Sequence, residues 1–170
     1  MNLLDAVTAV KCLRRTGWMQ LGVSDAETVA GHSFEAAVLA LELASIVGAS
    51  PEKAAVLALT HDLPEAVMGD IPKWTSSRVT RTDVEAATEI ESKNIAKLVS
   101  EFLEGETREA EVARLCDLLS TNIQARRYLK IGYDVTRIEE ETRGQILKML
   151  ESPRLKPLGK KVESLMGLNF

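Results

Sequence analysis

The two histidines of this chain, His32 and His61, are the residues best suited to chemistry, because both lie in apolar, helix-like segments. His61 is followed directly by Asp62, inside the apolar run 57–63. Imidazole and carboxylate are ligands that first-row transition metals favour. A buried carboxylate is costly unless it is paired or binds a metal, so Asp62 needs a partner. Each histidine, considered by itself, could instead be a hydrogen-bonded core residue and not a metal ligand.

Two more acidic residues follow this pair closely. Glu65 lies four residues after His61 and three after Asp62, and Asp70 follows in a turn. If one helix continued through Pro64, His61, Asp62 and Glu65 would lie on neighbouring faces. Proline removes a backbone donor and crowds the preceding turn, so a kink or a helix end is expected at that point. Acids, bases or ligands therefore crowd one helix end.

A third acidic position and a cationic position complete the candidates. Asp117 lies in the most apolar part of its helical segment. Its alternative interpretation is a buried ion pair with Arg114 or another nearby basic residue. Arg15 carries a planar fork of donors that matches a phosphate, and its alternative is a solvated cation at a helix end. Trp18 is a core or rim aromatic, or a stacking surface for a base.

These residues must be positioned by helices, because every long segment has helical periodicity. We expect an all-α, single-domain helical bundle of about six or seven helices spanning residues 1–170. The expected helices cover about 3–13, 26–47, 51–63, 84–104, 107–130 and 135–150, with a last segment after 153. Residues 18–26 and 73–83 are expected to be loops.

Local signals mark several of these boundaries. Ser50 followed by Pro51 is typical of a helix start. Thr107 is expected to open a helix. Glycine is typical of the position just after a helix, and it predicts helix ends at four places. These glycines are Gly17, Gly48, Gly105 and Gly132.

Composition limits the class of protein. The chain has 170 residues, 45% of them hydrophobic and 27% charged, with a formal net charge of −4. This charge argues against a nucleic-acid polymer as the partner, since such binders usually carry a basic face. No membrane span or signal peptide is expected, which makes the cytoplasm the default location. Cys12 and Cys116 are expected to be buried small hydrophobes without a disulfide.

Four stretches of this sequence resemble the HD-domain metal-dependent phosphohydrolases, and within them the branch of YfbR-type 5′-deoxynucleotidases. The likeness runs from about residue 10 to 130 and is carried by the motifs Arg14–Trp18, Glu27–Ser33 and His61–Pro72, together with Asp117. Two departures are small, because Gly31 replaces a frequent acidic residue, and Leu63-Pro64 replaces other residues between Asp62 and Glu65. Neither removes a functional group.

The resemblance implies a helical HD fold that holds one divalent metal. The implied ligands are His32, His61, Asp62 and Asp117. Arg15 would hold the substrate phosphate, while Glu65 and Asp70 would handle protons, in an order that the sequence leaves open. A mixed N/O site of this kind suits Mn, Fe, Co, Ni or Zn. A second metal is not expected, because no histidine remains to bind it.

By resemblance, the expected function is a metal-dependent phosphomonoesterase that hydrolyses nucleoside 5′-monophosphates, with 2′-deoxyribonucleotides preferred. Cleavage of a phosphodiester or of a polyphosphorylated nucleotide at the same metal site is an alternative. A helical binding module with a degenerate HD pocket is a second one. Relatives of this type also imply a homodimer or a higher homo-oligomer.

Overall fold

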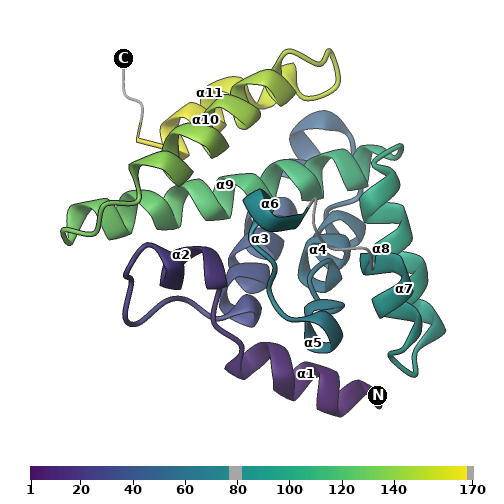
Figure 1. The fold of residues 1–170 in the computed structure, drawn as a ribbon. Coiled ribbons are helices and arrows are strands. Elements are labelled where there is room, and N and C mark those ends of the chain that lie inside the picture. The colour runs from purple at the N-terminus through teal and green to yellow at the C-terminus, as the bar shows by residue number, and fades with distance from the viewer. Residues whose placement is uncertain (77–81, 168–170) are drawn as a thin grey trace.

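The computed structural model describes residues 1–76 and 82–167 and is helical throughout that part of the chain (Figure 1). Its only extended pairing there is an isolated bridge between Arg14 and Thr28. Six helices have ten residues or more: α1 (Leu3–Cys12), α3 (Val29–Leu43), α4 (Pro51–Thr60), α8 (Lys93–Glu104), α9 (Arg108–Lys130) and α10 (Thr136–Leu150). The shorter segments are α2 (Thr16–Gln20), η1 (Ala44–Val47), α5 (Glu65–Met68), α6 (Lys73–Ser76), α7 (Asp83–Thr88), η2 (Lys156–Leu158) and α11 (Gly159–Leu165). The predicted all-α class is confirmed.

The longest helix, α9, crosses the middle of the molecule and organises the core (Figure 1). It packs against α3, α4, α8 and α10, while α3 also packs along α4. The main hydrophobic cluster lies where α3, α4 and α9 meet, and includes Leu43, Leu57, Leu115 and Leu119. Burying such side chains contributes about 1.5–3 kcal/mol each, so these three helices are held firmly relative to one another.

Several helix boundaries fall where the sequence predicts them. Ser50 accepts a hydrogen bond from the backbone N–H of Lys53 and caps α4, and Thr107 does the same for Ala110 in α9. Gly48 and Gly105 follow helices in the left-handed conformation, with φ of 69° and 66°. A residue with a Cβ is strained there, which explains glycine at both positions.

The prediction that Gly17 ends the first helix is wrong. Helix α1 ends at Cys12, and Gly17 lies inside the short helix α2. Residues 18–20 of the predicted loop 18–26 are also part of α2. Backbone pairing explains the early end, since the N–H of Val29 donates to Leu13 O (2.9 Å) and that of Arg15 donates to Glu27 O (3.0 Å). These distant partners hold residues 13–15 in an extended conformation beside the start of α3.

The single helix predicted over 84–104 is also wrong, because the structure breaks it into α7 and α8. Helix α7 ends at Thr88, and Ser92 caps α8 by accepting the N–H of Ile95. The chain terminus supports the break, since the Met1 ammonium donates to Glu89 O (2.7 Å) and the N–H of Glu91 donates to Met1 O (2.9 Å). Of the predicted loop 73–83, residues 73–76 form α6, and 77–81 lie outside the described residues.

The expectation that both cysteines are buried needs correction. Cys116 is buried, but Cys12 is exposed at the end of the amphipathic helix α1. The continuous segment 29–47, formed by α3 and η1, is long and apolar enough by composition to cross a membrane. It packs against α4 and α9, and the central helix of a bundle meets the same criterion.

Candidate metal centre

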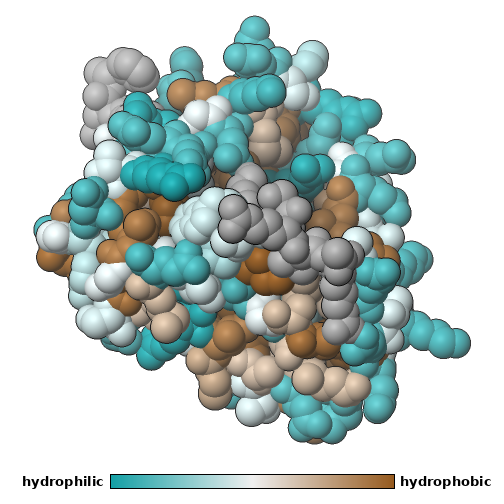
Figure 2. Space-filling view, viewed as in Figure 1, coloured by the Kyte–Doolittle hydropathy of each residue, from teal (hydrophilic) through white to brown (hydrophobic). Residues whose placement is uncertain are grey.

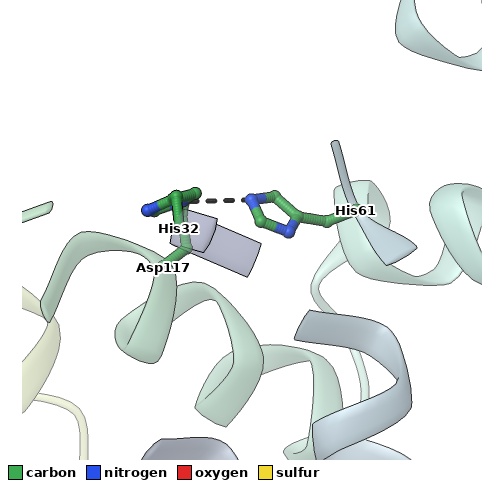
Figure 3. A group of neighbouring side chains, drawn as sticks. All are labelled: His32, His61 and Asp117. Carbon is green, nitrogen blue, oxygen red and sulfur yellow. Dashed lines mark hydrogen bonds and ion pairs between the residues drawn. The ribbon is translucent and has the colours of Figure 1, made fainter. Parts of the chain in front are cut away.

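Three helical elements bring His32, His61 and Asp117 together, and their side chains point toward one another (Figure 3). His32 lies near the start of α3, which begins where Thr28 accepts the N–H of Gly31 (3.0 Å). His61 follows the last residue of α4, and Asp117 lies in the middle of α9. Because these helices share the main core, their packing positions all three side chains, including His61 in the turn directly after α4.

The three side chains form a compact set of donors. His32 Nε2 lies 3.0 Å from Asp117 Oδ1, and His61 Nε2 lies 3.6 Å from the same oxygen. One ligand atom from each residue lies within 4.8 Å of the others. His32 is fully buried and His61 is 7% exposed. Asp117 thus faces the histidines, and the alternative ion pair with Arg114 is not what the structure has.

Asp62 stands beside this triad. Its Oδ1 lies 3.1 Å from His61 Nε2, and its Oδ2 lies 3.8 Å from His32 Nε2. The same Oδ2 accepts a hydrogen bond from Arg15 Nη1 (3.0 Å). The structure therefore brings all four predicted ligands together, with Asp62 divided between the histidines and Arg15.

The donor set fits a divalent cation. His61 Nδ1 donates to Ala58 O (2.7 Å), so the neutral ring presents the lone pair of Nε2 to the site. That Nε2 is buried and has no hydrogen-bond partner of good geometry. A buried polar atom without a partner is rare and calls for a ligand or an ion. Two imidazoles with carboxylates are a set that first-row transition metals bind.

Charges in the site hold a proton on His61. Burial by itself lowers the pKa of His61, but the carboxylates of Asp62 and Asp117 outweigh it and raise that pKa well above 6.5. Burial acts to raise the pKa of Asp117, and hydrogen bonds and charges from both histidines hold it well below 3.8. Without a cation in the site, His61 is therefore a protonated imidazolium, whereas a metal binds only the neutral imidazole.

Cation binding is therefore expected to release a proton. Apparent Zn²⁺ affinity should rise by up to about tenfold per pH unit, because only neutral His61 can ligate. The free energy of unfolding without a cation should instead fall as pH rises. Ionised His61 contributes fully below pH 6.5, its unfolded value, and the contribution is lost as pH rises through the raised folded-state pKa. Calorimetry in buffers of different ionisation heat counts the proton, and thermal melts with and without Zn²⁺ follow the stability. A proton count near zero at pH 7 would contradict this.

Arg15 lies at the rim of the triad and is held by two carboxylates. Besides its bond to Asp62, its Nε lies 3.6 Å from Asp70 Oδ1. Asp70 also accepts the backbone N–H of Thr16 at the start of α2. Burial lowers the pKa of Arg15, but the surrounding carboxylates outweigh it and raise that pKa. Arg15 is therefore a fixed cation beside the ligands and not a solvated helix-end charge.

Glu65 reaches the site although no regular helix runs through Pro64. Helix α4 ends at Thr60, residues 61–64 form turns, and Glu65 opens the short helix α5. Its Oε2 is buried and has no hydrogen-bond partner in the part of the chain that the structure describes. Burial and the charge of Asp62 raise the pKa of Glu65 to about 10. Glu65 therefore carries a proton at neutral pH while no cation balances the carboxylates.

A cavity of about 360 Å³ opens from the triad. This volume falls at the lower end of typical pockets for small ligands. Its charged end holds Arg15, His61, Asp62, Glu65, Asp70 and Asp117, and the rest of its wall includes Trp18, Trp74, Phe102, Leu118, Ile138 and Gln145. No pattern in the sequence pointed to the side chains of α10 that line this cavity, Ile138, Glu141, Thr142 and Gln145. Only the three-dimensional packing brings these near the histidines.

Trp18 contributes to the cavity wall from a packed position. It is 2% exposed, and its ring meets Tyr128 edge-on with 5.3 Å between the ring centroids. Its indole N–H donates to Glu27 Oε1 (2.9 Å). These contacts agree with the core-aromatic interpretation and leave one part of the ring facing the cavity.

Comparisons with known proteins agree with this geometry. A profile of the HD domain matches residues 7–156. The 5′-deoxynucleotidase HDDC2 of Danio rerio is 28% identical over 150 residues, covering 82% of this chain and 74% of that protein. HDDC2 of Dictyostelium discoideum is 30% identical over 138 residues, covering 71% and 73%. The sequence resemblance to HD-domain proteins is therefore confirmed.

Solved structures show the same fold over nearly the whole chain. The PH0347 protein of Pyrococcus horikoshii matches with a TM-score of 0.81 and 28% identity, covering 98% of this chain and all of that one. A conserved hypothetical protein from Pyrococcus furiosus matches with a TM-score of 0.85 and 25% identity, covering 96% of each chain.

Proposed function

This chain belongs to the HD-domain family, and on that premise we propose that it is a 5′-deoxynucleotidase. It hydrolyses nucleoside 5′-monophosphates, with 2′-deoxyribonucleotides preferred, to nucleoside and phosphate. The whole chain, 1–170, acts as one catalytic domain. One divalent transition metal, from the set Mn, Fe, Co, Ni or Zn, serves as its cofactor. The names of the HDDC2 relatives support the substrate class.

One observation carries this proposal: two buried imidazoles and Asp117 converge at the end of a cavity where Arg15 is fixed beside them. His32, His61, Asp62 and Asp117 would hold the cation. When bound, it would act as a Lewis acid on a phosphoryl oxygen and lower the pKa of nearby water. Arg15 has five N–H donors. Only some of them contact Asp62 and Asp70, so the others can bind a phosphate.

The two acidic residues Asp70 and Glu65 would have different roles. Asp70 is engaged with Arg15 and with the N–H of Thr16, which makes it a residue that positions the phosphate-binding cation. Glu65 has an oxygen without a hydrogen-bond partner and a raised pKa, which suits a group that exchanges a proton during turnover. Positive charge bound beside Glu65 lowers that pKa again, so the proton becomes transferable.

The direct test is phosphate release. Purified protein supplied with Mn²⁺ or Co²⁺ should liberate inorganic phosphate from dAMP or dTMP, and excess chelator should remove the activity. AMP serves as the comparison for the sugar preference, and a bis-ester such as bis-p-nitrophenyl phosphate as the comparison for phosphodiester cleavage. If no nucleoside monophosphate yields phosphate under any of the five metals, the proposal fails.

We also propose that the chain forms a homodimer through the outer face of α3 and α4. Phe34, Val38 and Leu41 on α3 and Val56 and Leu59 on α4 are 42–65% exposed. Exposed apolar residues that gather on two helices packed against each other are typical of an interface. The exposed large apolar residues of α7, α8 and α10 are Val84, Leu103 and Leu147, which are 38–43% exposed.

Val38→Glu is expected to convert this dimer to a monomer, because a charge placed in the apolar interface must be desolvated without a partner. Light scattering coupled to size exclusion measures the mass. Leu147→Glu, at an exposed position on α10, is the matched control and should leave the mass unchanged. A wild-type mass of one chain at micromolar concentration would overturn the interface.

The face shown in Figure 2 is mixed in polarity. In Figure 2 brown apolar patches lie between teal hydrophilic atoms, including the lower region where α1 runs. Leu3, Leu4 and Val7 of α1 are among the exposed apolar residues.

A further inference from the structure

The two proposed imidazole ligands are not supported equally. The ring of His61 is fixed from behind, because its Nδ1 donates to Ala58 O. The ring of His32 contacts Asp117 through Nε2, but its Nδ1 is buried and has no hydrogen-bond partner among the described residues. When Nε2 of a neutral imidazole binds a cation, the proton must reside on Nδ1. A buried N–H of this kind needs an acceptor, so His32 lacks a partner that its ligand role requires.

Glu27 is the carboxylate placed to supply that acceptor. Thr28 is the N-cap of α3, so Glu27 is the residue before the cap and His32 is the fourth residue of the helix. Side chains at these two positions commonly meet across the first turn of a helix, usually as a pair of hydrophobes. Here a carboxylate and an imidazole occupy them. The register at the start of α3 therefore places Glu27 and His32 at two positions whose side chains can meet.

Contacts and charge support this placement. Glu27 is held by its backbone, whose N–H donates to the Tyr128 hydroxyl (2.8 Å) and whose carbonyl accepts the N–H of Arg15 (3.0 Å). Its Oε1 accepts the indole N–H of Trp18, and a carboxylate retains capacity for further donors. Burial raises the pKa of Glu27, and the charges of His32 and then Arg15 act against that rise. The carboxylate thus lies within electrostatic reach of both.

We propose that Glu27 is a positioning residue for the metal ligand His32, whose Nδ1–H it accepts once Nε2 is ligated. The inference rests on the metal centre of the proposed function. Ligating histidines commonly donate their second N–H to a carboxylate, and loss of that partner costs about 10–100-fold in metal affinity. Through its other contacts, Glu27 ties this ligand to Arg15 and to the Trp18 wall of the cavity.

Imidazole NMR of the Zn²⁺-loaded, ¹⁵N-labelled chain tests this directly, because only two histidines contribute signals. In the wild type we expect His32 to carry its proton on Nδ1, with a strongly downfield and slowly exchanging ¹H resonance. Glu27→Gln should move that resonance upfield, speed its exchange and weaken Zn²⁺ binding about 10–100-fold. The His61 resonances should stay in place, because Ala58 O holds that ring. Calorimetry with Zn²⁺ alone measures the affinity.

Glu35→Gln is the matched control. It removes the same charge from a position inside α3, eight residues after Glu27, but Glu35 accepts hydrogen bonds from Arg127 (2.7 and 3.1 Å) and Ser120 (3.2 Å). It should leave the His32 resonance and Zn²⁺ affinity unchanged. Unchanged values in Glu27→Gln, an equal loss in Glu35→Gln, or a wild-type His32 without a proton on Nδ1 would each overturn the role of Glu27. If Glu27→Gln does not fold, the wild-type spectrum still tests the role of Glu27, because it shows whether His32 carries a proton on Nδ1. Failure of wild-type protein to bind Zn²⁺ would instead remove the metal centre itself.

Discussion

His61→Ala is expected to abolish divalent-metal binding and phosphate release together. The substitution removes an Nε2 that lies within 3.6 Å of both Asp62 and Asp117 and whose lone pair the Ala58 carbonyl already directs into the site. It also leaves two carboxylates facing each other without their imidazolium. Loss of a direct ligand should exceed the 10–100-fold that loss of an outer partner costs. Calorimetry with Zn²⁺ and a phosphate assay with Mn²⁺ measure the two effects.

Loss of packing must be separated from loss of ligation. His61 stacks near Phe102, with 4.7 Å between the ring centroids, so His61→Ala also opens space in the core. Phe102→Leu disturbs the same contact and keeps all four proposed ligands, so its Zn²⁺ affinity should stay close to that of the wild type. If Phe102→Leu loses Zn²⁺ as His61→Ala does, or if His61→Ala still binds Zn²⁺ tightly, His61 is not a ligand.

Helix boundaries set by local capping could be predicted from the sequence, and those set by distant contacts could not. Ser50, Thr107, Gly48 and Gly105 act through side chains and backbone angles within a few residues, and all four were placed correctly. The end of α1 depends on backbone bonds to residues 27–29. No pattern within residues 1–17 encodes that pairing.

The break between α7 and α8 is an intermediate case. Ser92 is a cap residue with a helix-forming sequence after it, so the signal was present and was overridden by the long helical periodicity of 84–104. What completes the break is the packing of Met1 against Glu89 and Glu91, which lie far away in the sequence. A capping search inside long periodic segments would have found the first part only.

For the site, residue types predicted the candidates and the fold supplied their geometry. Buried histidine and aspartate in apolar segments pointed to His32, His61 and Asp117, which the structure brings within 4.8 Å. For Glu27 the sequence predicted no role beyond membership of the motif Glu27–Ser33. A carboxylate just before a helix cap, five residues ahead of a candidate ligand, was the signal that could have singled it out.

Glu65→Gln is expected to separate turnover from metal binding. The change keeps the size of the side chain and removes its ability to give up or take a proton, so kcat should fall about 10²–10⁴-fold. Zn²⁺ affinity and KM for dAMP should change little, because Glu65 is not among the proposed ligands and Arg15 is held by Asp62 and Asp70. Steady-state kinetics with Mn²⁺ and calorimetry with Zn²⁺ give the two readouts.

Glu42→Gln is the control, since Glu42 pairs with Lys161 on the surface and should turn over as the wild type does. A structural role for Glu65 would instead lower the melting temperature and Zn²⁺ affinity along with kcat. A pure orienting role would leave the pH profile of kcat in place, whereas proton exchange at Glu65 requires one limb of that profile to disappear in Glu65→Gln. Normal turnover by Glu65→Gln would assign the proton to another group, and Asp70→Asn would then be the next variant to measure.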